Sequence, residues 1–192
     1  MDAKTTAALN QVAGALDIPP AWLDAVIAFE SNWKPQQRAY VPYNQYLVTK
    51  RNAPPKYAKG LIQFTDETAQ TLGFKDSADL IAQYPTADKQ LLTPVYNYFK
   101  KYKPFPTKQS LYMAVFYPIA RTWPLETVLP DSVRASNPNI NTVGDYVNFV
   151  EKKSLKKKAV ISAGAIAALV VIVFLTYKLL KGAENGREEN EE

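Results

Sequence analysis

Glu30 occupies a position where the apolar stripe of a predicted helix should continue. Leu23, Val26 and Ile27 recur at the spacing of one helix face, and position 30 is the next on that face. A carboxylate among apolar side chains loses hydration, which favours its protonated form and raises its pKa. A raised pKa suits a general acid that works near neutral pH. The alternative is a glutamate at a frayed helix end that points to solvent or caps a neighbour, and helical phase alone leaves both open.

The chain of 192 residues contains no Cys and no His. Without cysteine there is no disulfide, no Cys-zinc site and no thiol nucleophile. Without histidine, the usual general base of nucleophilic catalysis and the commonest metal ligand are both missing. We therefore predict no metal and no cofactor, and chemistry that rests on carboxylates, hydroxyls, amides, lysines or tyrosines.

No second carboxylate follows Glu30 closely, because residues 31–59 contain neither Asp nor Glu. Most glycosidases use two carboxylates that lie roughly 5–10 Å apart. The next acids, Asp66 and Glu67, fall in the first turn of a predicted helix, where the helix dipole accounts for them. A single acid favours a mechanism in which the substrate itself supplies the second reacting group.

Most of residues 1–150 are predicted to be helical, and proline, glycine and capping residues mark the helix ends. The helix that carries Glu30 begins at Asp17-Ile18-Pro19-Pro20 and ends by about Asn32. The other helices are expected from Thr65 to Gly73, from Ser77 to Pro85, from Thr86 to about Tyr102 with a kink or a new start at Pro94, from about Gln109 to Phe116, and from near Thr142 onward. Residues 34–59, rich in Pro, Asn, Gln and Tyr, predict a long loop or a short β excursion, and loops of that length are usually functional.

Four short motifs lie in order along residues 30–73. Glu30-Ser31 is followed by Gly60-Leu61-Ile62-Gln63-Phe64, then by Thr68-Ala69 and Leu72-Gly73. The set resembles the lytic transglycosylase family of the soluble-transglycosylase type, related to goose-type lysozyme. That family has Glu-Ser, Gly-Leu-Met-Gln, Thr-Ala and Leu-Gly, and here isoleucine replaces methionine with little change in volume. The resemblance covers about residues 20–120 and implies a mainly α, lysozyme-like domain over residues 1–150, with Glu30 as the catalytic acid.

The same resemblance implies that Ser31, Gly60, Gln63 and Phe64 bind substrate. Gly60 has no side chain, so a glycan strand could approach the backbone closely. The amide of Gln63 can donate to and accept from acetamido and hydroxyl groups of a sugar. The plainer interpretations also stand: Gln63 as a polar residue in a turn, and Ser31 as a polar residue at a helix end.

The family also has a later segment resembling Ala-Ala-Tyr-Asn-Ala-Gly, which contributes a tyrosine that holds the glutamate. Its loose counterpart here is residues 111–118, Leu-Tyr-Met-Ala-Val-Phe-Tyr-Pro. Tyr112 and Tyr117 are both candidates for this role, and the sequence does not choose between them.

The resemblance implies cleavage of the bond between N-acetylmuramic acid and N-acetylglucosamine in peptidoglycan, with a 1,6-anhydro product. The alternatives are a lysozyme-type muramidase used in lysis, an inactive lysozyme-like binding module of a virus particle, and a purely structural membrane protein. The partners expected are therefore glycan strands, membrane lipid and other virion proteins. Nucleic acid is not expected, because residues 1–150 carry 15 Lys and Arg against 12 Asp and Glu, a weak and scattered excess.

Residues 159–177 contain no charged side chain. A helix of roughly 20 apolar residues crosses a bilayer, so we predict a single transmembrane helix over residues 159–181. A buried core helix is the alternative, and the flanking lysines argue against it. Residues 151–158 form a basic juxtamembrane segment, and residues 182–192 an acidic tail expected to be disordered.

The predicted membrane topology points to a virus. Residues 1–16 do not read as a signal peptide, and more lysines precede the apolar segment than follow it. The positive-inside tendency then places residues 1–150 in the cytoplasm of the producing cell, whereas peptidoglycan lies outside that membrane. We therefore expect a single-pass protein of a virion membrane, or an internal virion component, that opens the host wall during genome delivery.

Overall fold

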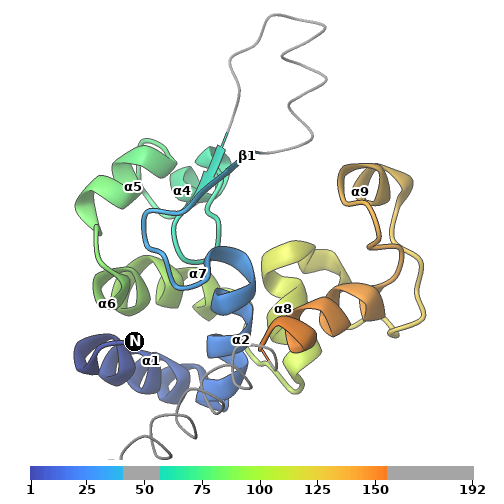
Figure 1. The fold of residues 1–192 in the computed structure, drawn as a ribbon, viewed down its shortest axis with the longest axis horizontal. Helices are drawn as coiled ribbons and strands as arrows, with labels where there is room; N and C mark the ends of the chain where they lie inside the picture. Colours follow the sequence, from blue (N-terminus) through green and yellow to red (C-terminus); the bar gives the residue numbers. More distant parts are fainter. Residues whose placement is uncertain (41–56, 155–192) are drawn as a thin grey trace, which may run out of the picture. The chain divides into compact units, whose positions relative to one another are not determined.

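The computed structural model describes residues 1–40 and 57–154, and over these ranges the protein is mainly α-helical, as predicted (Figure 1). The predicted transmembrane helix (159–181) and the acidic tail (182–192) lie outside the described residues, as do residues 155–158 of the basic segment 151–158. Within the described ranges no single helix is long and apolar enough to cross a membrane. Only α1 and α2 taken together, bent by 117° at their break, meet that test of length and composition.

Two helices that meet at a sharp bend form the N-terminal part of the fold. Helix α1 (Ala3–Leu16), which the sequence analysis did not predict, begins where the Asp2 carboxylate accepts the N–H of Thr5 at 2.7 Å. Helix α2 (Pro20–Ser31) has the predicted bounds, with proline in its first turn and Asn32 ending it in the left-handed region. The predicted stripe of α2 is fully buried and packs in the core.

A short β-hairpin follows, in agreement with the β excursion predicted for this region. Strands β1 (Arg38–Tyr40) and β2 (Tyr57–Lys59) are antiparallel, and Arg38 pairs with Lys59. A tight turn then returns the chain, because Lys59 and Phe64 exchange both backbone hydrogen bonds, at 2.9 and 2.7 Å. This turn brings Ile62 and Gln63 near Glu30 at the end of α2.

Helices α4 and α5 come next. Helix α4 (Asp66–Thr71) is capped by Thr65, as predicted, and Gly73 follows it at a φ of +91°. Helix α5 (Ser77–Gln83) begins one residue differently from the prediction, because Asp76 is the capping residue and accepts the N–H of Asp79. The Ser77 hydroxyl instead donates to Asp66 at 2.6 Å and ties α5 to α4.

The predicted kink at Pro94 takes the form of a π-helical segment. Helix α6 (Ala87–Gln90) passes into η1 (Leu91–Val95), and η1 passes into α7 (Tyr96–Lys100). Proline lacks the N–H that an α-helix would need at this point, and a wider turn absorbs the defect.

The C-terminal helices enclose the opposite side of α2. Helix α8 (Lys108–Phe116) starts at a capping box formed by Thr107 and Ser110, and the 3₁₀ turn η2 (Pro118–Ala120) follows it. The next helix, α9 (Asp131–Ser136), was not predicted; it buries no residue, so it has no apolar stripe to reveal it. The last described helix covers residues 143–154 and begins after Thr142, as expected. In Figure 1 it lies beside α8, and α8 contacts α2.

Gly60 is required by packing in the turn after β2. Its φ is +84°, and an added Cβ would lie 2.7 Å from Ile81 Cδ1 and 2.8 Å from Gln90 Oε1. The buried Gln90 amide cannot move away freely, because it accepts from Leu61 N at 2.9 Å and donates to two backbone carbonyls.

We therefore expect Gly60→Ala to lower the free energy of unfolding by about 2–4 kcal/mol through backbone strain and overpacking. Chemical denaturation of the full chain in detergent measures this loss. The matched control is Gly14→Ala in α1, where nothing lies within 4 Å of the added methyl and helix propensity favours alanine. Equal tolerance of the two changes would contradict the packing described.

Candidate functional site

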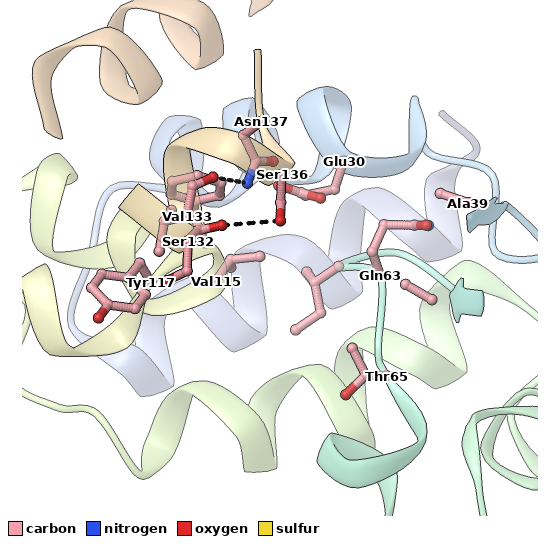
Figure 2. A pocket seen from close by; sticks show the side chains of 13 residues that line it. Glu30, Ala39, Gln63, Thr65, Val115, Tyr117, Ser132, Val133, Ser136 and Asn137 are labelled. Carbon is pink, nitrogen blue, oxygen red and sulfur yellow. Dashed lines mark hydrogen bonds between the residues drawn. The ribbon is translucent and has the colours of Figure 1, made fainter. Parts of the chain in front are cut away.

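A pocket of about 580 Å³ lies between the end of α2, the turn after β2, the end of α8 and helix α9 (Figure 2). Its lining is mostly apolar or uncharged, and it contains the carboxylate of Glu30. The lining residues are Glu30, Ala39, Ala58, Ile62, Gln63, Thr65, Val115, Phe116, Tyr117, Ser132, Val133, Ser136 and Asn137.

Glu30 lies in the last turn of α2 and is held by a tyrosine from the far end of the sequence. Tyr146 on the 143–154 helix donates its hydroxyl hydrogen to Glu30 Oε1 at 2.7 Å. The tyrosine is only 1% exposed, whereas the glutamate is half-buried and lines the pocket. The carboxylate therefore has one oxygen fixed by the protein within a site that a ligand can enter.

Two aromatic rings fix the orientation of Tyr146. The Phe116 ring stacks on it, with centroids 4.3 Å apart and planes 11° from parallel. Phe29, the neighbour of Glu30, meets it edge to face at 5.4 Å. Both arrangements are favourable for aromatic pairs, so the hydroxyl that contacts Glu30 is preorganised rather than free to rotate away.

Burial raises the pKa of Glu30 from 4.5 to about 7, against the hydrogen bond from Tyr146 and the charge of Lys153, which both lower it. Loss of hydration penalises the charged form, and at this site it outweighs the two effects that favour that form. Near neutral pH the protonated and ionised forms are then present in comparable amounts. Such a group can donate a proton in one step and accept one in the next.

Among the described residues that line the pocket, Glu30 is the only acid. The stretch 31–59, part of which lies outside the described residues, has no Asp or Glu in its sequence. Asp66, the next acid, accepts both the N–H and the hydroxyl of Ser77 and serves the junction of α4 and α5. Nowhere in residues 1–40 and 57–154 do three acidic side chains gather closely enough to hold a metal ion.

Of the residues predicted to bind substrate, the structure places Gln63 and Tyr117 in the pocket with Glu30. Gln63 has a left-handed backbone, with φ +56°, and its Nε2 donates to Gly60 O at 2.8 Å. Its Oε1 is buried and has no hydrogen-bond partner within the described part of the chain. Tyr117 packs its ring edge against Trp123, which places it on the wall made by the end of α8.

Ser31, Gly60 and Phe64, which were also predicted to contact substrate, do not line this pocket. Ser31 is buried and its hydroxyl donates to Ile27 O at 3.2 Å, within its own helix. Phe64 is a core side chain, and Gly60 makes room for Ile81 and Gln90 rather than for a ligand. These three residues pack behind the pocket lining and support it.

Tyr112 does not contact Glu30, which corrects one of the two tyrosine candidates. It is 1% exposed and donates its hydroxyl hydrogen to Glu151 Oε1 at 2.6 Å, on the 143–154 helix. Tyr117, the other candidate, lines the pocket but makes no hydrogen bond to Glu30 in the structure. The tyrosine on Glu30 is Tyr146, which the sequence analysis missed.

A signal for Tyr146 was present in the sequence. Val143, Tyr146, Val147 and Val150 recur at the spacing of one helix face, and all four are buried. A tyrosine on such a stripe has to find a partner for its hydroxyl. The family resemblance covers residues up to about 120, so it gives no indication of this helix.

The raised pKa of Glu30 has a consequence for stability. In the folded state the pKa is about 7, above the unfolded value near 4.5, so this group's stabilising contribution is complete below pH 4.5 and is lost as pH rises through 7. Gln at this position stays neutral. We expect Glu30→Gln to be more stable than the wild type by about 1–3 kcal/mol at pH 8 and about equal to it at pH 4.5. Thermal unfolding of both chains at the two pH values measures this, and an equal difference at both would contradict a buried, neutral Glu30.

No protein-family model, curated protein or solved structure is similar enough to this chain to count as a match.

Proposed function

We propose that this protein is a peptidoglycan lytic transglycosylase that uses Glu30 alone as its catalytic carboxylate. The observation that carries the proposal is the isolation of Glu30 in the pocket, with a pKa near 7 and no second acid among the described lining residues. Most hydrolytic glycosidases, whether retaining or inverting, use a partner carboxylate. A site with one acid suits a reaction in which the sugar's own hydroxyl is the nucleophile.

The proposed reaction begins with Glu30 protonated. It donates its proton to the glycosidic oxygen that links N-acetylmuramic acid to N-acetylglucosamine, and the bond from C1 to that oxygen breaks with its electron pair going to the oxygen. The 6-hydroxyl oxygen of the same muramic acid residue then bonds to C1, and its proton passes to the Glu30 carboxylate. Glu30 ends as it began, and no water is consumed.

The pocket walls suit a neutral amino sugar. Ile62, Val115 and Val133 offer apolar surface for ring faces and acetamido methyl groups, and no described lining residue is a cation. Polar groups that can meet sugar hydroxyls stand on both sides of the pocket, with Gln63 and Thr65 on one and Asn137 on the other (Figure 2).

The setting of the reaction forms the second part of the proposal: a membrane anchor at residues 159–181 and delivery to the wall by a virus particle. Its support is the uncharged stretch 159–177 with five lysines at 152–158 before it and two after it. Protease treatment of intact particles tests the location. The chain should be protected until the particle is opened, and absence from particles would favour a role in lysis instead.

Purified murein sacculi test the activity. The full chain in detergent should release soluble muropeptides and clear the suspension, whereas an inactive binding module would sediment with sacculi and leave them intact. The position of Glu30 in the pocket and its raised pKa favour an enzyme, because carboxylates with raised pKa values in clefts cluster at catalytic sites.

A further inference from the structure

We propose that Lys153 is a positioning residue for the proposed reaction: it caps the C-terminal end of α2 and keeps Tyr146 in contact with Glu30. The inference rests on the proposed function only in assuming that Glu30 carries out a reaction. The geometry that supports it belongs to the two helices and would hold for any chemistry carried out by Glu30.

Lys153 meets α2 at the residue next to Glu30. Its Nζ donates to the backbone oxygen of Phe29 at 2.6 Å. Asn32 closes the helix by donating its N–H to Ala28 O, so the Phe29 carbonyl is one of the last-turn acceptors that need a partner from outside the helix. A cation at a helix C-terminus also interacts favourably with the helix dipole.

The same lysine belongs to the stripe of the 143–154 helix that carries Tyr146. The two positions are seven residues apart, which is two helical turns, and Val150 lies between them fully buried. The Lys153 ammonium also lies 5.2 Å from the centre of the Phe29 ring, and that ring meets Tyr146 edge to face. Lysine, phenylalanine, tyrosine and glutamate therefore form one continuous chain of contacts from the helix end to the site.

A second contact fixes this end of the helix on the other side. Glu151 accepts from Tyr112 at 2.6 Å and pairs with Lys108 at 2.9 Å, and both partners belong to α8. Glu151 thus holds the helix to α8, and Lys153 holds it to α2. Loss of the Lys153 contact would leave Tyr146 anchored to α8 but free to shift relative to Glu30.

Three groups that bear a proton or a charge face Glu30. Tyr146 and Lys153 come from the last helix, and both lower the pKa of Glu30. Tyr98 on α7 is the third: burial raises the pKa of its hydroxyl, and the Glu30 charge adds to that rise. Lys153 is the only cation of the three, so its removal should raise the pKa of Glu30. Because the ammonium is exposed and screened by solvent, we expect a shift of about half a pH unit.

Four variants separate the charge of Lys153 from its hydrogen bond. Lys153→Arg keeps both, Lys153→Gln keeps a donor but no charge, and Lys153→Met loses both. Lys152→Met is the matched control, since Lys152 is exposed one position earlier on the same helix.

The titration of the Glu30 carboxyl carbon, followed by NMR in full-length chain labelled at glutamate and held in detergent, gives the first readout. Its signal is identified by its absence in Glu30→Gln. The pKa should rise by about half a unit in Lys153→Gln and Lys153→Met and stay unchanged in Lys153→Arg and Lys152→Met. Equal pKa values in Lys153→Met and Lys152→Met would overturn the proposal.

The rate of sacculus digestion gives the second readout. Lys153→Met should lower kcat several-fold and leave KM unchanged, because Lys153 does not line the pocket. The alkaline limb of the variant's pH–rate profile should move to higher pH. Lys153→Arg should restore the wild-type profile. A change in KM alone would overturn the positioning role. A wild-type chain that digests nothing would overturn the proposed function, and the titration would still decide whether Lys153 acts on Glu30.

Discussion

Glu30→Gln should lower the rate of sacculus digestion by about 1,000-fold or more. General acid–base catalysis contributes roughly 100- to 10,000-fold, and here one group performs both proton transfers. Glutamine preserves the size of the side chain and can still accept the hydrogen bond from Tyr146. Its amide is not acidic, however, and cannot protonate the glycosidic oxygen. The release of soluble muropeptides from purified sacculi measures the loss.

The control for this change is Glu126→Gln, which removes an exposed acid outside the pocket lining. It should digest sacculi at the wild-type rate. If Glu30→Gln kept most of the activity, the site would have to lie elsewhere, whatever the properties of the pocket.

Tyr146→Phe should lower kcat by about 10- to 100-fold, which corresponds to the free energy of one hydrogen bond to a charged group. The lost donor stabilises the ionised carboxylate, so its removal raises the pKa of Glu30 further. The alkaline limb of the pH–rate profile, where Glu30 loses the proton it must donate, should therefore move to higher pH. Steady-state rates between pH 5 and 9 measure both effects.

Tyr112→Phe is the matched control, because it removes a hydroxyl from an equally buried tyrosine that contacts Glu151 rather than Glu30. The two variants should lose similar stability, but only Tyr146→Phe should lose activity and shift the profile. Equal loss of activity in both would mean that the hydroxyls serve only the packing of the last helix.

The sequence was sufficient to predict the local structure around Glu30. Helix α2, its start at the prolines and its end by Asn32 follow from rules that act within one turn, and so does the disruption at Pro94. The stripe of α2 offered a Glu30 that loses hydration as one of two interpretations, and the raised pKa agrees with that one. Such features depend on neighbours a few residues away, which a sequence displays directly.

The contact between Glu30 and Tyr146 was not predicted, because the two residues come from distant elements. Tyr146 is 116 residues further along the chain, and its place beside Glu30 depends on how α8 and the last helix pack. Gly60 posed the same difficulty. A glycine that packs against Ile81 and Gln90 cannot be told, from sequence alone, from a glycine that makes room for substrate. Helix α9 forms a pocket wall without burying a residue, so no hydrophobic pattern indicated it.

The products released from sacculi in water enriched with ¹⁸O test the central claim most directly. If Glu30 closes the muramic acid ring on itself, mass spectrometry will find muropeptides with anhydro ends. These ends will contain no ¹⁸O and will resist reduction by borohydride. Products that carry one added water containing ¹⁸O, with reducible ends, would contradict the account and make the protein a hydrolase.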